Sequence, residues 1–395
     1  MKILFLSFFY KPDLSAGSFR NTALVDILKN KIKPEDEIEV LTTMPNRYHT
    51  FKAQASETET DGNVTIRRIK LSAHKNGFAD QVISYRDYYR SVKRLTKGKN
   101  YDLIYASSSK LFTAFLGARL AKKMRLPLYL DIRDIFTDTM NEVLKNKIAK
   151  TFILPSLKFI ERYTVNNASH INFVSKGFEN YFKSIYKGST SFYTNGIDDE
   201  FLELANQQNK NNSLKTEKLI TYAGNIGEGQ GLEKIIPFAA KKLGNKYKFR
   251  IIGDGGAKKH LVNKLQEMKV DNVEILQPVN RNKLKEHYAE SDFLFLHLNN
   301  YKAFEKVLPS KIFEYGATRK GIIAGVGGYA NQFIHENIPD AILFSPGETD
   351  ELLEKLNSYK PNGNYRQKFL EKFNRNRIMN EMAESILKLL PDYKK

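Results

Sequence analysis

The sequence contains no cysteine and no tryptophan, and only seven of its 395 residues are histidine. The lack of cysteine excludes disulfide bonds, thiolate metal sites and a cysteine nucleophile. The histidines show neither HxxxH nor HExxH spacing, and no Asp-x-Asp pair occurs anywhere in the chain. We therefore expect no bound metal ion and no other resident cofactor.

Long hydrophobic runs are also absent. No stretch approaches the roughly 18 apolar residues that a membrane-spanning helix needs. The run 1–10 is apolar but short, and Lys11-Pro12-Asp13 ends it, so we interpret it as a buried first strand and not as a leader peptide. This pattern predicts a cytoplasmic protein that is either soluble or peripheral to a membrane.

Acidic residues are scarce relative to basic ones, and the imbalance is concentrated in one half. The net charge is +19, of which residues 1–190 carry +14 and the remainder +5. A basic half favours an anionic partner, such as nucleic acid, anionic lipid or a phosphorylated substrate. The alternative is that the lysines only make the surface soluble.

Short apolar segments alternate with amphipathic ones along most of the chain, which is typical of parallel α/β sheets. The expected strands of the first half are 2–8, 37–42, 64–69, 103–106, 128–132 and 171–174. Those of the second half are 218–223, 248–252, 273–276, 293–296, 321–324 and 341–344.

The length of the chain exceeds what one hydrophobic core usually supports. The polar stretch 206–213 cannot bury anything and indicates a surface loop close to a domain boundary. We therefore predict two doubly wound, Rossmann-like domains, 1–195 and 196–374, with ligands at the carboxyl ends of their strands. The stretch 375–395 forms an amphipathic helix that either caps the second domain or crosses back to complete the first.

One segment of the second half has the features of a nucleotide site. Pro309 and Ser310 are typical helix-opening residues, so the N–H groups of Ser310 and Lys311 should face outward at a positive helix end that suits phosphate. Glu314 follows one turn later, where its carboxylate can accept two ribose hydroxyls.

Three other strand ends in this half carry loops of similar character. Their glycines leave room for a close ligand, although each loop alone is as well explained as a plain turn. Four such loops on one edge favour a nucleotide diphosphate. The candidate residues in these three loops are Asn225, Gly227 and Gln230, then Gly253 and Asp254, then Val279.

With these motifs the chain resembles retaining glycosyltransferases of the GT-B type, in the large family 4 that includes bacterial lipopolysaccharide and capsule transferases. It is most similar to the N-acetylfucosamine-transferase-like subgroup. The resemblance spans nearly the whole chain. The motifs that carry it are Phe9-Tyr10-Lys11-Pro12 with Ala16-Gly17 and Arg20, Asp131-Ile132-Arg133-Asp134, Phe173-Val174-Ser175, Asn195-Gly196-Ile197-Asp198, Tyr222-Ala223-Gly224-Asn225, Gly253-Asp254-Gly255 and Pro309 to Tyr315.

The resemblance implies that the second domain holds a nucleotide-sugar donor, with UDP expected. Glu314 would then bind the ribose, the helix start at Pro309, Ser310 and Lys311 the diphosphate, and Val279 would lie beside the uracil. From the first domain, Gly17 would close over the sugar phosphate, and Arg20 would be a second phosphate partner.

The chain departs from the family pattern at two places. Relatives carry Arg and Lys near the first glycine loop, where this chain has Asn225 and Gln230. The family's E-x7-E motif would put a carboxylate where Lys306 stands, with Glu305 one place away. The diphosphate is therefore expected to contact Lys311 or Lys306.

The reaction implied is transfer of a sugar, with retention, to a lipid-linked acceptor such as an undecaprenyl diphosphate, or to a saccharide. Asp131, Arg133 and Asp134 are expected at a strand end of the acceptor domain. We assign Asp134 to orienting or deprotonating the acceptor hydroxyl, and Arg133 to holding the acceptor or a phosphate. The alternative is an Asp–Arg–Asp cluster that only fixes the loop.

Basic residues also alternate with Phe, Val, Ile and Tyr in the stretch 75–99, after Arg67-Arg68-Ile69-Lys70. Such a segment suits the anionic inner face of a cell membrane, although an ordinary solvated helix has the same composition. Other functions remain open: a nucleotide-sugar epimerase of the same architecture, a non-catalytic partner subunit, and a nucleic-acid-binding protein. Against the last, the sequence has no RNP-like, zinc-finger or helix-turn-helix signature.

Overall fold

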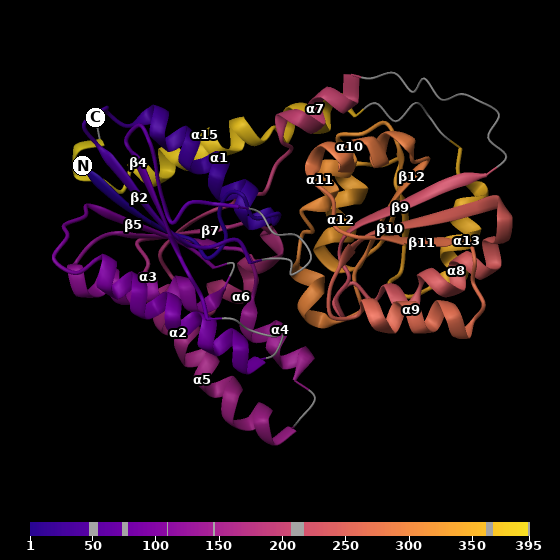
Figure 1. Cartoon of the computed structure of the whole chain (residues 1–395), viewed down its shortest axis with the longest axis horizontal. Coiled ribbons are helices and arrows are strands. Elements are labelled where there is room, and N and C mark those ends of the chain that lie inside the picture. Colours follow the sequence, from indigo (N-terminus) through magenta and orange to yellow (C-terminus); the bar gives the residue numbers. More distant parts are fainter. Residues whose placement is uncertain are drawn as a thin grey trace. The chain divides into compact units, whose positions relative to one another are not determined.

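The computed structural model describes residues 1–46, 54–72, 78–108, 110–144, 147–206, 217–360 and 366–393. The chain forms two compact units (Figure 1). The first consists of Met1–Asn195 together with Asn376–Lys395, and the second is Gly196–Arg375.

The first unit contains an eight-stranded sheet in the order β3-β4-β2-β1-β5-β6-β7-β8, parallel except for the β3–β4 pair. The central strands are buried on both faces, as continuous apolar runs require in a parallel sheet. The strands are β1 (Lys2–Leu6), β2 (Glu37–Thr43), β3 (Thr58–Asp61), β4 (Val64–Ile69), β5 (Leu103–Ser107), β6 (Leu128–Ile132), β7 (His170–Phe173) and β8 (Ser189–Ser191).

Helices cover both faces of this sheet, with α1 and α15 on one face and α2, α3 and α5 on the other (Figure 1). The arrangement follows from right-handed crossovers that leave the central strand in opposite directions. The helices are α1 (Ala16–Lys31), α2 (Phe78–Leu95), α3 (Leu111–Met124), α4 (Phe136–Val143), α5 (Lys147–Asn166), α6 (Glu179–Lys183) and α15 (Arg375–Leu387).

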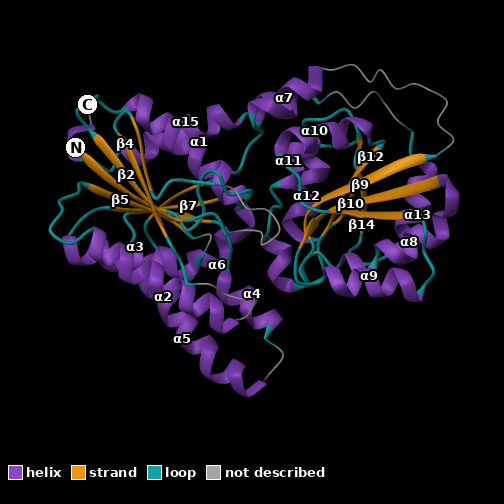
Figure 2. Ribbon diagram, viewed as in Figure 1, coloured by secondary structure: helices purple, strands orange, loops and turns teal. Residues whose placement is uncertain are grey.

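The second unit contains a six-stranded parallel sheet in the order β11-β10-β9-β12-β13-β14. Figure 2 shows its strands between two helical layers. The strands are β9 (Lys218–Asn225), β10 (Tyr247–Asp254), β11 (Val273–Leu276), β12 (Phe293–His297), β13 (Gly321–Gly325) and β14 (Ile342–Phe344). The helices are α7 (Asp199–Asn206), α8 (Ile236–Leu243), α9 (Lys258–Glu267), α10 (Arg281–Glu290), α11 (Lys311–Gly316), α12 (Gly328–Asn337), α13 (Thr349–Ser358) and α14 (Gln367–Lys372).

The predicted fold class is confirmed: the chain has two doubly wound parallel α/β sheets. Each of the twelve predicted strands is present with both ends within two residues of its predicted bounds. Strands β3 and β8 were not predicted, because their Thr, Ser, Glu and Asp residues give no apolar signal.

The last helix belongs to the first unit. Met382 and Ile386 on its apolar face are fully buried, and the Ser385 hydroxyl lies 2.9 Å from the hydroxyl of Tyr129 on β6. Lys31 on α1 forms an ion pair of 2.9 Å with Glu384. Of the two alternatives for this segment, the structure therefore has the return to the first sheet.

The strand orders fix where ligands can sit. In a doubly wound sheet the crevice opens at the carboxyl ends of the strands where the order reverses. That point lies between β1 and β5 in the first unit and between β9 and β12 in the second.

Candidate functional site

The centre of the candidate site in the second unit is a partly exposed ion pair at the start of α11. Lys311 Nζ lies 2.9 Å from Glu314 Oε2, and the side chains are 25% and 13% exposed. The Tyr288 hydroxyl donates to the same carboxylate oxygen at 3.1 Å. The structure thus brings together, on one helical turn, the residues that are predicted to bind the ribose and the diphosphate.

The helix begins where the sequence predicts. Backbone bonding starts with Ile312 N–H to Pro309 O at 3.2 Å and Phe313 N–H to Ser310 O at 3.2 Å. In the described structure the N–H groups of Ser310 and Lys311 have no hydrogen-bond partner. The turn therefore keeps two donors beside the Lys311 ammonium.

One tyrosine joins α11 to the end of β9, and a second is bonded within the end of β9 itself. The buried Tyr315 hydroxyl accepts from Ala223 N–H at 3.4 Å, and Tyr222 donates to Asn225 O at 2.6 Å. A side chain at Gly224 would reach 3.7 Å from Lys311 Cε, so the loop after β9 adjoins the Lys311 stem. This contact joins two of the predicted loops.

The loop after β9 is braced from within. Gln230 Oε1 accepts from Asn225 Nδ2 at 2.9 Å and from Gly227 N–H at 3.2 Å. Asn225 and Gln230, which replace the family's Arg and Lys, therefore hold the loop in shape. A Cβ at Gly227 would lie 2.5 Å from Asn225 Nδ2, so this glycine makes room for the brace.

Gly253 has a packing role at the end of β10. A Cβ at Gly253 would lie 1.9 Å from Gly224 O, and its φ is +155°. The glycine is required for the close approach of β10 to β9, a packing role that the sequence interpretation did not include. Asp254 Oδ1 accepts from the Gly255 N–H at 2.9 Å, which makes a local turn.

Val279 and Lys306 lie at the same sheet edge. Val279 is half-buried in the loop between β11 and α10, before the Asn280 side chain that caps α10 by accepting from Lys283 N–H at 2.9 Å. Lys306 ends the short 3₁₀ segment Lys302–Lys306 after β12. The side chain of Glu305, its neighbour, is exposed.

The sequence interpretation missed His297 at the end of β12. Gly347 N–H donates to its Nε2 at 3.0 Å, so Nδ1 carries the proton and donates to Gln230 O at 2.6 Å. Burial lowers the pKa of His297 to about 4, which keeps the ring neutral. His297 thus fixes the far end of the braced loop, and the only sequence signal for it was its place at the end of an apolar strand.

Asn299 was missed as well. Its backbone N–H donates to Gly229 O at 2.8 Å, and its side chain donates to Glu228 O and accepts from Lys234 Nζ at 3.1 Å. The segments after β9 and β12, on either side of the point where the strand order reverses, are therefore joined by several hydrogen bonds.

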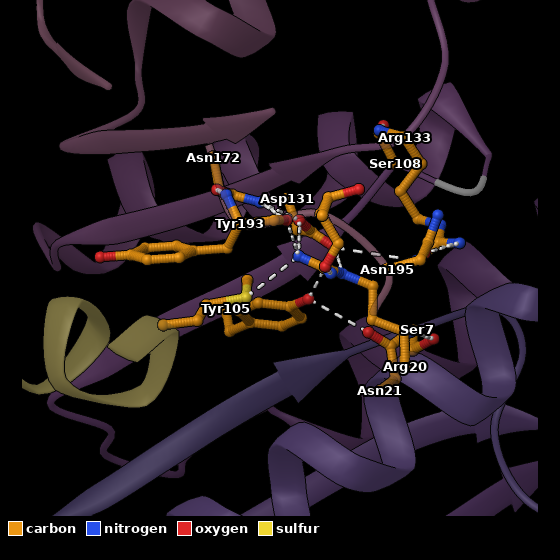
Figure 3. Close-up of polar contacts among 12 residues, drawn as sticks. Ser7, Arg20, Asn21, Tyr105, Ser108, Asp131, Arg133, Asn172, Tyr193 and Asn195 are labelled. Carbon is orange, nitrogen blue, oxygen red and sulfur yellow. Dashed lines mark hydrogen bonds and ion pairs between the residues drawn. The ribbon is translucent and has the colours of Figure 1, made fainter. Parts of the chain in front are cut away.

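Three of the five predicted site residues of the first unit, Arg20, Asp131 and Arg133, lie in a buried network (Figure 3). Arg20 donates to both carboxylate oxygens of Asp131, at 2.8 and 3.0 Å, and both side chains are 0% exposed. Arg20 also donates to Tyr193 O at 2.8 Å and to Thr194 O at 2.5 Å. Asn172 donates to Asp131 at 2.8 Å.

These contacts correct two predictions. Arg20 was expected to bind a phosphate, but its guanidinium is enclosed and bonded to Asp131 and to the chain at Tyr193 and Thr194. Burial opposes the charge on Asp131, yet Arg20 outweighs it and the pKa of that carboxyl stays below its usual value. An ionised, enclosed carboxylate with its oxygens occupied cannot meet an acceptor, so Asp131 has a structural role.

Arg133 and Asp134 differ from Asp131. Arg133 Nη1 lies 4.0 Å from Asp131 Oδ2, and Nη2 donates to Asn195 Oδ1 at 3.3 Å, with the side chain 8% exposed. Burial lowers the pKa of Arg133 from its usual value. Asp134 is exposed at the carboxyl end of β6. Of the three predicted catalytic residues, Asp134 is therefore the one that solvent reaches.

Asp134 also lines a small cavity with Ser108, Phe136 and Glu161. Its volume is only about 10 Å³ and its lining is mainly apolar, so it is too small for a sugar or a nucleotide. Gly17 lies in the first turn of α1, whose N-cap Ser15 accepts from Ser18 N–H at 3.1 Å.

Within the described residues no group of three or more His, Asp or Glu side chains could hold a metal ion. No helix of the described chain is both long and apolar enough to cross a membrane.

Residues 205–376 match the family model described as "Glycosyl transferases group 1". The second unit is therefore similar to group 1 glycosyltransferase domains. It contains both the Lys311–Glu314 pair and the braced loop after β9.

This match to the group 1 glycosyltransferase family is joined by a curated relative, WcaI of Escherichia coli (strain K12), whose name describes a glycosyl transferase of colanic acid biosynthesis. It is 28% identical over 162 residues, which cover 38% of this chain. The chain thus spans only 39% of that relative's length. Together the two matches indicate a glycosyltransferase.

Several solved structures have the same fold. Sucrose-phosphate synthase from Thermosynechococcus elongatus is 14% identical, with a TM-score of 0.73 over 98% of this chain and 99% of that chain. Anabaena HepE in complex with UDP and glucose is 16% identical, with a TM-score of 0.69 and the same coverage. WaaG, a glycosyltransferase involved in lipopolysaccharide biosynthesis, is 14% identical, with a TM-score of 0.62 over 97% and 95%. These likenesses show that the fold is GT-B.

Proposed function

We propose that the protein is a retaining glycosyltransferase that transfers a sugar from a UDP-sugar to an acceptor in the assembly of a surface polysaccharide. The observation that carries the proposal is the partly exposed Lys311–Glu314 pair, at the carboxyl edge of the sheet in the matched domain. HepE, of the same fold, was solved with UDP and glucose.

In this proposal the nucleotide takes over contacts that the ion pair now makes internally. Glu314 accepts the ribose hydroxyls, while Lys311 turns from the carboxylate to the diphosphate, which carries more negative charge. The free N–H groups of Ser310 and Lys311 add neutral donors at the same place. Val279 lies beside the base.

The chemical task is to stabilise the charge on the leaving diphosphate and on an oxocarbenium-like sugar. Lysine and backbone N–H donors stabilise the charge on the leaving diphosphate without a metal ion. Asp134 orients or deprotonates the acceptor hydroxyl. Arg133, the residue before Asp134, holds an anionic group of the acceptor.

The acceptor proposed is lipid-linked, such as an undecaprenyl diphosphate, or a saccharide, and the site of action is the inner face of the cell membrane. WcaI and WaaG are named for colanic acid and lipopolysaccharide biosynthesis, which supports an envelope polysaccharide as the product.

Calorimetric titration with UDP, GDP and ADP in the presence of EDTA tests the nucleotide site. We expect selective binding of UDP, and its loss in Glu314→Ala. Glu267→Ala, which removes an exposed carboxylate of the same unit, is the matched control and should bind UDP normally.

Two results would contradict the proposal. Absence of binding to all three nucleotides would point to a non-catalytic partner subunit, consistent with Lys306 and Gln230 replacing the family residues. Turnover of a UDP-sugar to an epimer without any acceptor would assign the Lys311–Glu314 site to an epimerase.

A further inference from the structure

Helices α2, α3 and α5 form one layer on a single face of the first sheet, here termed the basic layer (Figure 1). Tyr85 on α2 donates to Phe112 O on α3 at 2.5 Å, and Phe115 on α3 packs edge-on against Tyr163 on α5 at 5.5 Å. The three helices are therefore packed side by side, and their exposed side chains point away from the sheet.

The outer face of the basic layer carries charge of one sign. Every exposed charged side chain that the structure describes on these three helices is Lys or Arg. Asp87 is half-buried and accepts from Ser72 Oγ at 2.6 Å, while Glu161 is buried and accepts from Tyr181 at 2.5 Å. The exposed cations are Arg86, Arg90, Lys93, Arg94, Arg119, Lys122, Lys123, Lys158 and Arg162.

Large hydrophobic side chains are exposed on the same layer. Phe152 and Phe159 on α5 are 74% and 71% exposed, and Val82 and Ile83 on α2 are 50% and 37% exposed. These are four of the six large hydrophobic side chains exposed in the described part of the chain. Phe152 and Phe159 are seven residues apart, so they lie on one side of α5, about 10 Å from each other along its axis.

We propose that the basic layer docks on a lipid bilayer that contains anionic phospholipids. The inference rests on the proposed function, because a lipid-linked acceptor brings the enzyme to such a surface. Phenylalanines enter the boundary between head groups and acyl chains, and the surrounding Lys and Arg contact the phosphates. Hydrophobic insertion and charge attraction add, so neither has to hold the protein alone.

Charge and side-chain type argue against other partners. Two copies of the chain meeting through this layer would place like charges opposite each other, which is unfavourable. Valine and isoleucine do not stack on bases as the platforms of single-strand-binding proteins do. Two exposed phenylalanines among cations suit a bilayer better than either alternative.

The layer differs from the membrane segment predicted from the sequence. Of that segment, 75–77 lies outside the described residues. Tyr88 is 0% exposed and donates to Leu41 O at 2.8 Å, and Arg68 is buried against Glu59 at 2.7 Å. These two side chains are buried and cannot contact a membrane. Helix α5, which the prediction left out, carries the most exposed phenylalanines.

Co-flotation of the full chain with vesicles, without nucleotide, tests the inference. We expect binding to vesicles of phosphatidylcholine mixed with phosphatidylglycerol, little binding to phosphatidylcholine alone, and weaker binding as salt rises. Phe152→Ser with Phe159→Ser should lower the partition coefficient about tenfold or more, and Lys158→Gln with Arg162→Gln about tenfold. Phe238→Ser, an exposed phenylalanine of the second unit, is the matched control and should bind as the unchanged chain does.

Absence of binding to phosphatidylglycerol vesicles, or normal binding by the double phenylalanine variant, would overturn the inference. So would a dimer in light scattering that the same variant converts to monomer. UDP titration of each sample separates the two hypotheses: a chain that binds UDP but no vesicles keeps the proposed function and loses the docking surface. All four substitutions are at exposed positions, so folding is expected to be retained.

Discussion

Each unit has an Arg or Lys paired with a carboxylate near the carboxyl edge of its sheet, yet the two pairs have different roles. Arg20 and Asp131 are fully buried, whereas Lys311 and Glu314 keep 25% and 13% of their side chains exposed. The first pair has its hydrogen-bonding groups used inside the protein, whereas the second is exposed enough to exchange its partner for the proposed nucleotide. If the proposal holds, burial and not residue type separates the structural ion pair from the binding one.

The comparison is tested most strongly by breaking the buried pair. Arg20→Met leaves the buried Asp131 carboxylate with the more distant Arg133, at 4.0 Å, as its counter-charge, and it also removes donors from Tyr193 O and Thr194 O. We expect a loss of about 3–5 kcal/mol in the free energy of unfolding of the first unit. Hydrogen exchange at the amides of β6 measures this locally.

Lys242→Met is the control for that experiment, because it removes one partner of the exposed pair with Asp350. Its effect should stay below about 1 kcal/mol. Similar losses in the two variants would mean that the Arg20–Asp131 pair contributes no more than a surface ion pair.

The role of Arg20 could not have been read from the sequence. Its partners Asp131 and Thr194 lie 111 and 174 residues away, and an arginine near the start of a helix after a β-strand is equally suited to a phosphate. Asp131 ends an apolar strand, which placed it correctly at the sheet edge but did not tell whether its side chain faces solvent.

Twelve strands, the doubly wound fold class and the Pro309–Glu314 turn were predictable. Apolar periodicity and helix-capping residues are local properties of the sequence. The packing role of Gly253 could not be predicted, since its contact with Gly224 O depends on the approach of a neighbouring strand. His297 was missed because its partners, Gln230 O and Gly347 N–H, come from other loops.

The effect of burial on a titratable group of the second unit, His297, is tested by varying the pH. The pKa of the His297 imidazole falls from 6.5 to about 4 on folding, because burial disfavours the charged ring. Above pH 6.5 the ring is neutral in both states. Between pH 6.5 and about 4 only the unfolded chain takes up the proton, so stability should fall as pH falls, by up to about 3 kcal/mol.

Hydrogen exchange at β12 across this pH range measures the effect. His297→Gln should remove the local dependence, while His260→Gln, which changes an exposed histidine of the same unit, should keep it. An unchanged slope in His297→Gln would show that the ring is not buried as a neutral group.

The exposed pair is separated into its two proposed roles by comparing UDP with uridine. Lys311→Gln should weaken UDP binding about 10- to 100-fold and leave uridine unaffected, because uridine has no diphosphate. Glu314→Gln should weaken both ligands by a similar factor, because both carry the ribose. Calorimetric titration gives the four affinities.

Equal losses for uridine in both variants would contradict the division of roles between Lys311 and Glu314. The thermal midpoint of each variant serves as the control. The pair is partly exposed, so either substitution should change stability by less than about 1 kcal/mol.

The smallest effect is expected from the brace of the loop after β9. Gln230→Ala removes the acceptor of Asn225 Nδ2 and Gly227 N–H, which should cost about 1 kcal/mol of local stability. The loop adjoins Lys311 through Gly224, so a looser loop should also weaken UDP binding by a few-fold, as preorganisation is lost. Gln230→Glu keeps the acceptor and serves as the matched variant: it should retain the stability that Gln230→Ala loses. If Gln230→Glu lost as much local stability as Gln230→Ala, the carbonyl oxygen of Gln230 would not be the group that holds the loop after β9.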